Sequence, residues 1–413
     1  MSDPSQRARA IFEAGVRAAD PAGGVSAAMD WVREDPPGPG GRWQVVALGK
    51  AALAMAGAAL RALPEGAQAL IVTNPENAEN AEAPEDATLI AGDHPVPGAG
   101  SQRAGQAILD CLARMGPEDR VLALISGGGS ALAVAPAEGL SLADKAEVSR
   151  LLLGCGADIT QMNLIRQQLS RLKGGGWLGA SAAPVTGLIL SDVPGDDLRV
   201  IASGPTVAPI GTRREAADLC RGLGIWTKLP ETVQRVLGQE TEAAPQPPAR
   251  NRLIGANGIS VDAMVVAGAE RGPFPLEGDV ADLAPRFVSL LRDLAPGQAL
   301  AFGGETTVTL RGDGLGGRNQ ELALRVALAA EEAGVDGAWC FLSGGTDGRD
   351  GPTDAAGGLV GPDTCATARA QGFDPRDALA RNDSYHALKA AGALLMTGAT
   401  GTNVADLAVL IRG

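Results

Sequence analysis

The sequence twice places a short apolar strand directly before a glycine-rich turn, and this pattern restricts the fold more than any other feature. In the first copy, the apolar run Val121–Ile125 leads into a turn made of Ser126, Gly127, Gly128, Gly129 and Ser130. An unbroken apolar run of this length is typical of a strand buried on both faces of a parallel sheet. Glycines let backbone N–H groups converge where a Cβ atom would intrude, and serine hydroxyls add donors, so the turn suits a phosphate or a carboxylate. A tight turn without a ligand explains this segment, taken alone, equally well.

The second copy lies near the other end of the chain. Trp339–Leu342 is again apolar and is followed by Ser343, Gly344, Gly345, Thr346 and Asp347. Open α/β sheets bind their ligands at the carboxyl ends of parallel strands. We therefore expect an α/β protein in which each turn serves one half of a two-part substrate.

The length of the chain predicts two domains, because 413 residues exceed what one ordinary hydrophobic core supports. The polar segment 241–250 contains Pro245, Pro247 and Pro248 and is the expected linker. We expect residues 1–240 to form a Rossmann-like α/β domain that carries the first glycine turn, and residues 251–413 to form a second α/β domain. Each domain is expected to be a largely parallel sheet flanked by helices.

Composition narrows the range of partners. The formal net charge of −13 argues against nucleic acid and against an anionic membrane surface. The N-terminus has no apolar leader and no apolar run approaches membrane-spanning length, so a cytoplasmic protein is expected. Five scattered cysteines without a Cys-x-x-Cys pair and only two histidines argue against a disulfide framework and a zinc site.

Two charged residues that follow predicted strands are candidate catalytic groups. Lys50 follows the strand 43–48 at a strand-to-helix corner, where free helix N–H groups favour anions. The corner is not a P-loop, because the upstream glycine and the following Ser or Thr are missing. Asp192 follows the buried strand 185–190 and precedes a Pro-Gly turn, a good place for a general base or a metal ligand. A solvated lysine and an ordinary acidic turn are the alternatives.

A glycine fingerprint of the form G-x-G-x-x-G occupies residues 312–317, between a predicted strand and a predicted helix. That context suits dinucleotide binding, but the acidic residue expected at the end of the next strand is missing. Arg318 and Asn319 at the start of the helix are more informative, because a guanidinium beside free helix N–H groups suits phosphate oxygens. Asp347 is a candidate magnesium ligand, since Mg²⁺ takes only one or two carboxylates besides phosphate oxygens. An acidic surface loop is the alternative.

For His94 and for three basic residues further along the chain, the sequence allows either a functional or a purely structural role. His94, between a predicted strand and Pro95, either orients a substrate or makes a structural hydrogen bond. Arg166, Arg171 and Lys173 lie along and just after a predicted helix, where they either act or form a solvated face. The solvated interpretation is favoured for Arg171.

As an ordered set, these segments resemble the glycerate 2-kinase family, whose C-terminal part is the MOFRL domain. The resemblance spans nearly the whole chain, from about Gly49 to Val404. The matching stretches are Leu48–Ala51, Ile125–Ser130, Leu190–Asp197, Ala202–Pro205, Gly316–Glu321, Gly344–Ala356 and Gly401–Val404. The chain departs from the family pattern at Gln167 and Gln168, where Lys-His is expected.

The resemblance implies phosphoryl transfer from ATP, with Mg²⁺, to the 2-hydroxyl of D-glycerate, in a cleft between the two domains. It assigns charge stabilisation to Lys50 and Arg318 and proton abstraction or metal-linked positioning to Asp192. The first glycine turn, Gly344, Gly345 and Asn319 would hold substrate or nucleotide, and Asp347 would hold metal. Only small molecules are implied as partners, and a homo-oligomer is left open. An NAD(P)-dependent hydroxypyruvate reductase and a non-catalytic protein that binds a sugar acid or a nucleotide are the alternatives.

Overall fold

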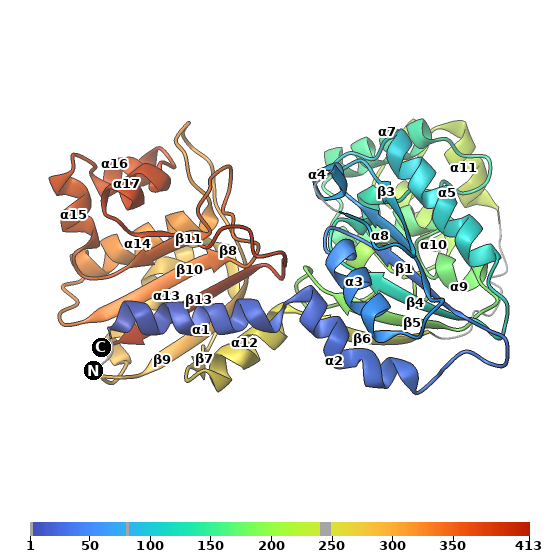
Figure 1. Cartoon of the computed structure of the whole chain (residues 1–413). Helices are drawn as coiled ribbons and strands as arrows, with labels where there is room; N and C mark the ends of the chain where they lie inside the picture. Colours follow the sequence, from blue (N-terminus) through green and yellow to red (C-terminus); the bar gives the residue numbers. More distant parts are fainter. Residues whose placement is uncertain (1–2, 80–81, 240–248) are drawn as a thin grey trace. The chain divides into compact units, whose positions relative to one another are not determined.

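The structure, a computed structural model, describes residues 3–79, 82–239 and 249–413 (Figure 1). The chain forms two units: a first unit, Pro21–Ile254, and a second unit, Met1–Asp20 with Gly255–Gly413. This division differs from the predicted domains 1–240 and 251–413. The expected linker 241–250 lies outside the described residues, apart from its last two positions.

The first helix explains the difference at the N-terminus. α1 (Pro4–Ala18) buries Ile11 and Phe12 in a cluster with Leu407 and Val409 of the last strand. Burial of two large side chains of this kind contributes several kcal/mol, on the order of 1.5–3 for each. The helix therefore belongs to the second unit, although it opens the chain (Figure 1).

The first unit is built on a six-stranded sheet in the order β3-β2-β1-β4-β5-β6. The four ladders from β3 to β5 are all parallel, which confirms the predicted parallel sheet. The strands are β1 (Trp43–Leu48), β2 (Gln68–Thr73), β3 (Ala87–Ala91), β4 (Arg120–Ile125), β5 (Val185–Leu190) and β6 (Arg250–Gly255). From β1, the sheet is extended on one side by β2 and β3, and on the other side by β4 and β5. The strand order therefore reverses between β1 and β4.

Helices flank this sheet and form a second core beside it. The side core joins four helices through Leu152, Ile165, Cys220 and Val233. The helices of the unit are α2 (Pro21–Arg33), α3 (Ala52–Ala62), α4 (Pro75–Glu79), α5 (Ala99–Ala113), α6 (Gly129–Leu132), α7 (Leu142–Gly154), α8 (Ile159–Gln168), α9 (Gly176–Ala180), α10 (Arg213–Gly222) and α11 (Glu231–Gly238). Ser141 and Asp158 begin α7 and α8 with reciprocal capping bonds, which satisfy N–H groups that lack helical partners. These two helices form a wall of the site described below.

The second unit has a mixed sheet in the order β12-β11-β10-β13-β9-β7, with β8 beside β9. Only β7 and β8 run parallel to β9, and the other four ladders are antiparallel. The strands are β7 (Glu270–Arg271), β8 (Leu276–Asp279), β9 (Ala299–Thr307), β10 (Trp339–Gly345), β11 (Gly357–Val360), β12 (Leu394–Leu395) and β13 (Asp406–Arg412). The expectation of a largely parallel sheet is therefore wrong for this unit.

The error has a physical cause, because this sheet is covered on both faces. Leu407 and Val409 contact α1 and α12 (Asn257–Val266), whereas Ala408 and Leu410 contact the opposite helix layer. A strand covered on both faces reads as an unbroken apolar run in either orientation, so the sequence pattern alone does not distinguish the two.

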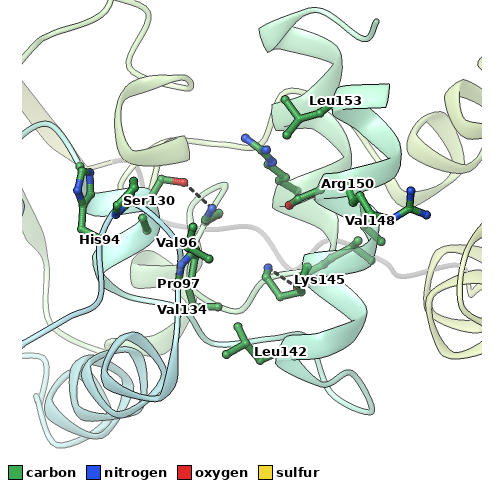
Figure 2. Close-up of a pocket in the computed structure, with 18 residues that line it drawn as sticks. His94, Val96, Pro97, Ser130, Val134, Leu142, Lys145, Val148, Arg150 and Leu153 are labelled. Carbon is green, nitrogen blue, oxygen red and sulfur yellow. Dashed lines mark hydrogen bonds between the residues drawn. The ribbon is translucent and has the colours of Figure 1, made fainter. Parts of the chain in front are cut away.

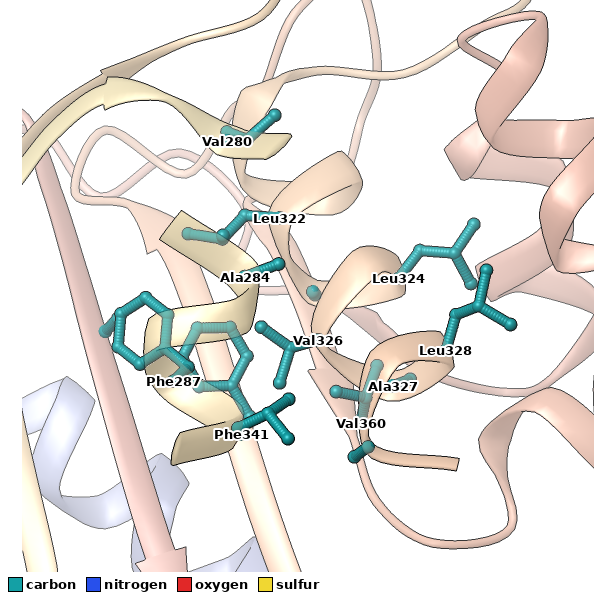
Figure 3. Packing of buried hydrophobic residues seen from close by; sticks show 14 of the residues in the cluster. Val280, Ala284, Phe287, Leu322, Leu324, Val326, Ala327, Leu328, Phe341 and Val360 are labelled. Atoms are coloured by element: carbon teal, nitrogen blue, oxygen red, sulfur yellow. The ribbon is translucent and has the colours of Figure 1, made fainter. Parts of the chain in front are cut away.

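The opposite layer contains α13 (Val280–Asp293) and α14 (Arg318–Glu332), with α15 (Thr364–Ala370), α16 (Pro375–Ala380) and α17 (Ser384–Ala390) packed nearby. Phe287 of α13 contacts Phe302 and Phe341, with ring centroids 4.8 and 4.6 Å apart. Figure 3 shows Phe287 and Phe341 beside Val326 of α14. Within the described ranges, no helix combines the length and the apolar character needed to cross a membrane.

Candidate functional site

The first glycine turn lies where the strand order of the first unit reverses. β1 and β4 are neighbours, with Leu48 opposite Ile125, so their carboxyl ends bring Lys50 to the turn. The Lys50 N–H donates to the Gly127 carbonyl at 2.9 Å, and Ser126 Oγ accepts from the Ala51 N–H at 3.1 Å. In open α/β sheets this reversal point is where ligands bind. The hydrogen bond from Ala51 to Ser126 Oγ links the two strand ends, so this hydroxyl already accepts a bond within the protein.

Asp192 and His94 surround the same turn. A Cβ atom placed on Gly127 would lie 2.1 Å from Asp192 Oδ2, and one on Gly128 would lie 3.3 Å from Lys50 Cγ and 3.5 Å from His94 Nε2. Burial, and then the Lys50 ammonium, lower the pKa of His94, so its imidazole is neutral at physiological pH. The structure thus brings together three side chains that the sequence had placed after three separate strands.

The end of the turn is held by a buried chain of hydrogen bonds. Lys173 Nζ donates to Ser130 Oγ at 2.6 Å, Ser130 Oγ lies 3.1 Å from Ser203 Oγ, and Ser203 Oγ donates to Asn163 Oδ1 at 2.9 Å. Lys173 is 8% exposed, and burial, followed by repulsion from Lys145 and Arg166, holds the pKa of its amine well below its usual range. The sequence allowed either a functional role or a solvated position for Lys173. In the structure Lys173 is buried beneath the turn.

Gln167, where the chain departs from the family pattern, supports this arrangement. Its amide nitrogen donates to the carbonyls of Arg199 and Ser203, at 2.9 and 3.2 Å, and its oxygen accepts from the Ile210 N–H at 2.8 Å. Ser203 has a φ of +61°, a conformation that non-glycine residues rarely adopt without external support. Gln167 therefore fixes the backbone that carries Ser203.

A pocket of about 590 Å³ adjoins the turn, between the His94–Pro97 segment and α7 (Figure 2). Four of its lining residues are cationic and none is acidic. Arg150 is paired with Glu147, whereas Lys145, Arg166 and Lys173 make no ion pair among the described residues. Lys145 Nζ donates only to the Leu169 carbonyl, at 3.0 Å, among the contacts of the described residues. Burial, and then Arg166, lower the pKa of Lys145 to about 8.

Lys145 was missed by sequence reasoning. It lies in the first turns of α7, where a lysine is usually solvated, and the only available signal was the scarcity of lysine in this chain. Arg166, which the sequence left open between function and a solvated face, is instead half-buried at the pocket, where burial lowers its pKa.

In the second unit, Arg318 is engaged by carboxylates. Its Nε and Nη2 donate to the two oxygens of Asp406 at 2.6 and 3.0 Å, and Nη1 lies 2.7 Å from Glu305 Oε1. The Asp406 side chain is 1% exposed, whereas that of Glu305 is 39% exposed. A phosphate that approaches Arg318 would therefore compete with Glu305, the more exposed partner.

The helix N–H groups beside Arg318 are also occupied. Asp350 accepts from the N–H groups of Asn319 and Gln320 at 3.1 and 2.8 Å, so they are not the free donors that the sequence predicted. Burial raises the pKa of Asp350 to about 6, although these N–H groups oppose the shift. Both polar atoms of the Asn319 side chain have partners as well: Nδ2 donates to Asp350 and Asp406, and Oδ1 accepts from Ser343 Oγ at 2.7 Å.

The second glycine pair lies inside a strand. Gly344 and Gly345 end β10. Gly344 pairs with Gly357 of β11 and Leu407 of β13, and Gly345 pairs with Asp406 of β13. A Cβ atom on Gly344 would lie 2.6 Å from Leu395 Cδ2. Gly344 therefore packs against the core, whereas a Cβ atom on Gly345 would lie 2.6 Å from the Arg349 carbonyl oxygen in the following turn. Asp347 follows them and accepts the Arg349 N–H at 2.9 Å within its turn. Among the residues that the structure describes, no three His, Cys, Asp or Glu side chains cluster as metal ligands would.

The glycines of the G-x-G-x-x-G segment are used for packing as well. A Cβ atom on Gly312 would lie 2.5 Å from the Arg381 carbonyl oxygen, and one on Gly314 would lie 2.5 Å from Asp383 Cβ. The Gly314 N–H donates to the Arg381 carbonyl at 2.9 Å. The flanking strands β9 and β10 are not neighbours, because β13 lies between them. This segment therefore lacks the open cradle that a dinucleotide requires.

Comparisons with known proteins cover most of the chain. Residues 7–238 match the family described as a domain of unknown function, DUF4147, and residues 298–406 match the MOFRL family. The D-glycerate 2-kinase of Thermotoga maritima is 40% identical, covering 88% of this chain and 89% of that protein. An Agrobacterium vitis protein with the provisional name hydroxypyruvate reductase is also 40% identical, covering 98% of this chain and 94% of that one. The crystal structure of a glycerate kinase from T. maritima matches with a TM-score of 0.90 at 36% identity and 98% coverage of both chains.

Proposed function

The chain belongs to the family that joins a DUF4147 domain to a MOFRL domain, and from that premise we propose that it is a D-glycerate 2-kinase. It would transfer the terminal phosphoryl group of ATP to the 2-hydroxyl of D-glycerate. The observation that carries the proposal is the meeting of Lys50, Asp192 and the glycine turn 126–130 at the reversal point of a parallel sheet. The similarity to the D-glycerate 2-kinase of T. maritima supports the choice of substrate.

The chemistry follows from the residues at this corner. Phosphoryl transfer needs mainly positioning, positive charge around the transferring oxygens and a group that takes the hydroxyl proton. Asp192 is assigned to take that proton, and Lys50 to neutralise charge on the phosphoryl oxygens. The backbone of Gly127 and Gly128 can approach an anion closely because neither residue has a side chain.

Magnesium, when bound, neutralises the charge of the nucleotide phosphates. Asp192 fits this ion, because Mg²⁺ needs only one or two carboxylates besides phosphate oxygens and water. Asp347, one oxygen of which accepts from its own turn, stays a predicted ligand. Arg318 keeps its proposed role in charge stabilisation through exchange of Glu305 for phosphate. A site shared by the two units stays a prediction.

The enzyme is assigned to the cytoplasm, where ATP is available and thiols stay reduced. All five cysteines are free, and four of them are buried.

The test is product formation from D-glycerate, ATP and Mg²⁺, with phosphorus NMR to tell 2-phosphoglycerate from 3-phosphoglycerate. We expect the 2-isomer, with the signal lost in Lys50→Ala and Asp192→Asn and retained in the exposed control Lys228→Ala. Each loss should exceed about a hundredfold, the usual effect of removing a charge-stabilising or proton-accepting group. Oxidation of NADH or NADPH with hydroxypyruvate, and no phosphorylated product, would overturn the proposal in favour of a reductase.

A further inference from the structure

We propose that the pocket between the His94–Pro97 segment and α7 is the nucleotide site, with the polyphosphate at Lys145, Arg166 and Lys173 and the base between Val96 and Leu153. The inference rests on the proposed kinase function and adds to it the place and the chemistry of ATP recognition. Figure 2 shows the pocket with the His94–Pro97 segment on one side and α7 on the other.

The charges of the pocket call for an anion. Four cations line it, and no carboxylate lines it with them. Arg150 is paired with Glu147, which leaves Lys145, Arg166 and Lys173 as the three cations that argue for an anion. An ammonium group has three donors. Among the hydrogen bonds of the described residues, Lys145 uses one donor on Leu169 and Lys173 uses one on Ser130. Buried like charges without a counterion are unfavourable, and an anionic ligand with several charges would relieve them. Burial and Arg166 lower the pKa of Lys145, and a bound anion would oppose this shift.

The size and the rim of the pocket favour a ligand larger than a three-carbon acid such as glycerate. A volume of about 590 Å³ is in the range of pockets that hold whole cofactors, and a three-carbon acid would fill only a small part of it. Val96 is 74% exposed and Leu153 is 69% exposed, and they come from the two walls. A single exposed apolar side chain is ordinary, but two that line one charged pocket from different elements offer apolar surface that suits a flat base.

The pocket is continuous with the transfer site. His94, Gly128 and Ser130 line it, and Lys50 Cγ and His94 Nε2 both approach Gly128. A polyphosphate held at Lys145 and Lys173 would extend along the turn toward Lys50. The end of the nucleotide that reacts would therefore meet the groups assigned to phosphoryl transfer. Arg150, which also lines the pocket, is already paired with Glu147 and is not assigned to the ligand.

The experiment measures binding of ATP and of inorganic tripolyphosphate to the full chain by calorimetry, without glycerate. The variants are Lys145→Met, which removes a charge and keeps the apolar stem, and Leu153→Asn, which removes an apolar side chain and adds no charge. Lys228→Met, at an exposed lysine of the same unit, is the control. Melting temperatures establish that each variant is folded, and Arg166→Met replaces Lys145→Met if that variant does not fold.

Lys145→Met should weaken both ATP and tripolyphosphate by about tenfold or more, as expected when a hydrogen bond to a charged group is lost. Leu153→Asn should weaken ATP several-fold and leave tripolyphosphate unchanged, because only ATP carries a base. In turnover, KM for ATP should rise while KM for glycerate stays the same.

A raised KM for glycerate with unchanged ATP binding would overturn the inference and leave the kinase assignment standing. Equal weakening of ATP and tripolyphosphate by Leu153→Asn would refute the placement of the base. Failure of the wild-type chain to phosphorylate glycerate would instead refute the proposed function, so the two failures are distinguishable.

Discussion

Replacing Gly127 by alanine should displace Asp192 without unfolding the protein. The added Cβ would lie 2.1 Å from Asp192 Oδ2 and 2.8 Å from its Cγ. Gly127 is not among the residues with a positive φ, so alanine is compatible with its backbone. The conflict therefore falls on the Asp192 carboxylate, which must retreat by about 1 Å to reach a tolerable contact distance.

The magnitude follows from this displacement. A misplacement of about 1 Å in a reacting group can reduce the rate by about a hundredfold, which is about 2.7 kcal/mol in the activation barrier. The free energy of unfolding should change by less than about 1 kcal/mol, because the partly exposed carboxylate can rotate away and Gly→Ala reduces the entropy of the unfolded chain.

The assay is kcat for glycerate phosphorylation, with urea denaturation measured on the same samples. Gly222→Ala is the matched control, since no atom lies within 4 Å of its added Cβ and its φ is not positive. It should keep full activity and should be slightly more stable. A Gly127→Ala enzyme with unchanged kcat would show that the position of Asp192 is not needed, and would refute the role assigned to that residue.

Three further changes test other parts of the structure. Burial lowers the pKa of Lys145 from 10.5 to about 8. Between these two pH values the unfolded chain binds a proton that the folded chain does not. The free energy of unfolding without ligand should therefore rise with pH in this range. Urea denaturation at several pH values between 8 and 10.5 should show this rise, and Lys145→Met should reduce it. Asp406→Asn should lower the free energy of unfolding by about 2–3 kcal/mol, which is less than the usual loss for a broken buried ion pair because Arg318 still contacts Glu305. The control Asp262→Asn, in the exposed pair with Arg271, should change it by less than about 1 kcal/mol. Equal effects of the two substitutions would contradict the structural importance of the Arg318–Asp406 pair. Gln167→Ala removes three hydrogen bonds around Ser203 and should cost about 2 kcal/mol in urea denaturation together with a lower kcat; unchanged values of both would show that the turn needs no support.

The candidate site of the first unit was predictable in its main parts. The apolar runs before Lys50, the glycine turn and Asp192 indicated buried parallel strands, and such strands place their carboxyl ends at one edge of a sheet. The convergence of these residues therefore followed from local patterns. The basic pocket did not, because Lys145 comes from a capped helix whose place beside the turn depends on the side core formed by α7, α8, α10 and α11.

The sequence by itself determined the strand-to-glycine corners and the residues that follow them, because both depend on short apolar runs and on the absence of a Cβ atom. Only the tertiary structure decided how the second unit uses its similar pattern. There β13 runs antiparallel between β9 and β10, Gly344 packs against Leu395, and Asp350 caps the helix that begins at Arg318. Strand direction and capping between distant segments depend on which surfaces pack together, and a strand buried on both faces gives the same apolar run in either direction.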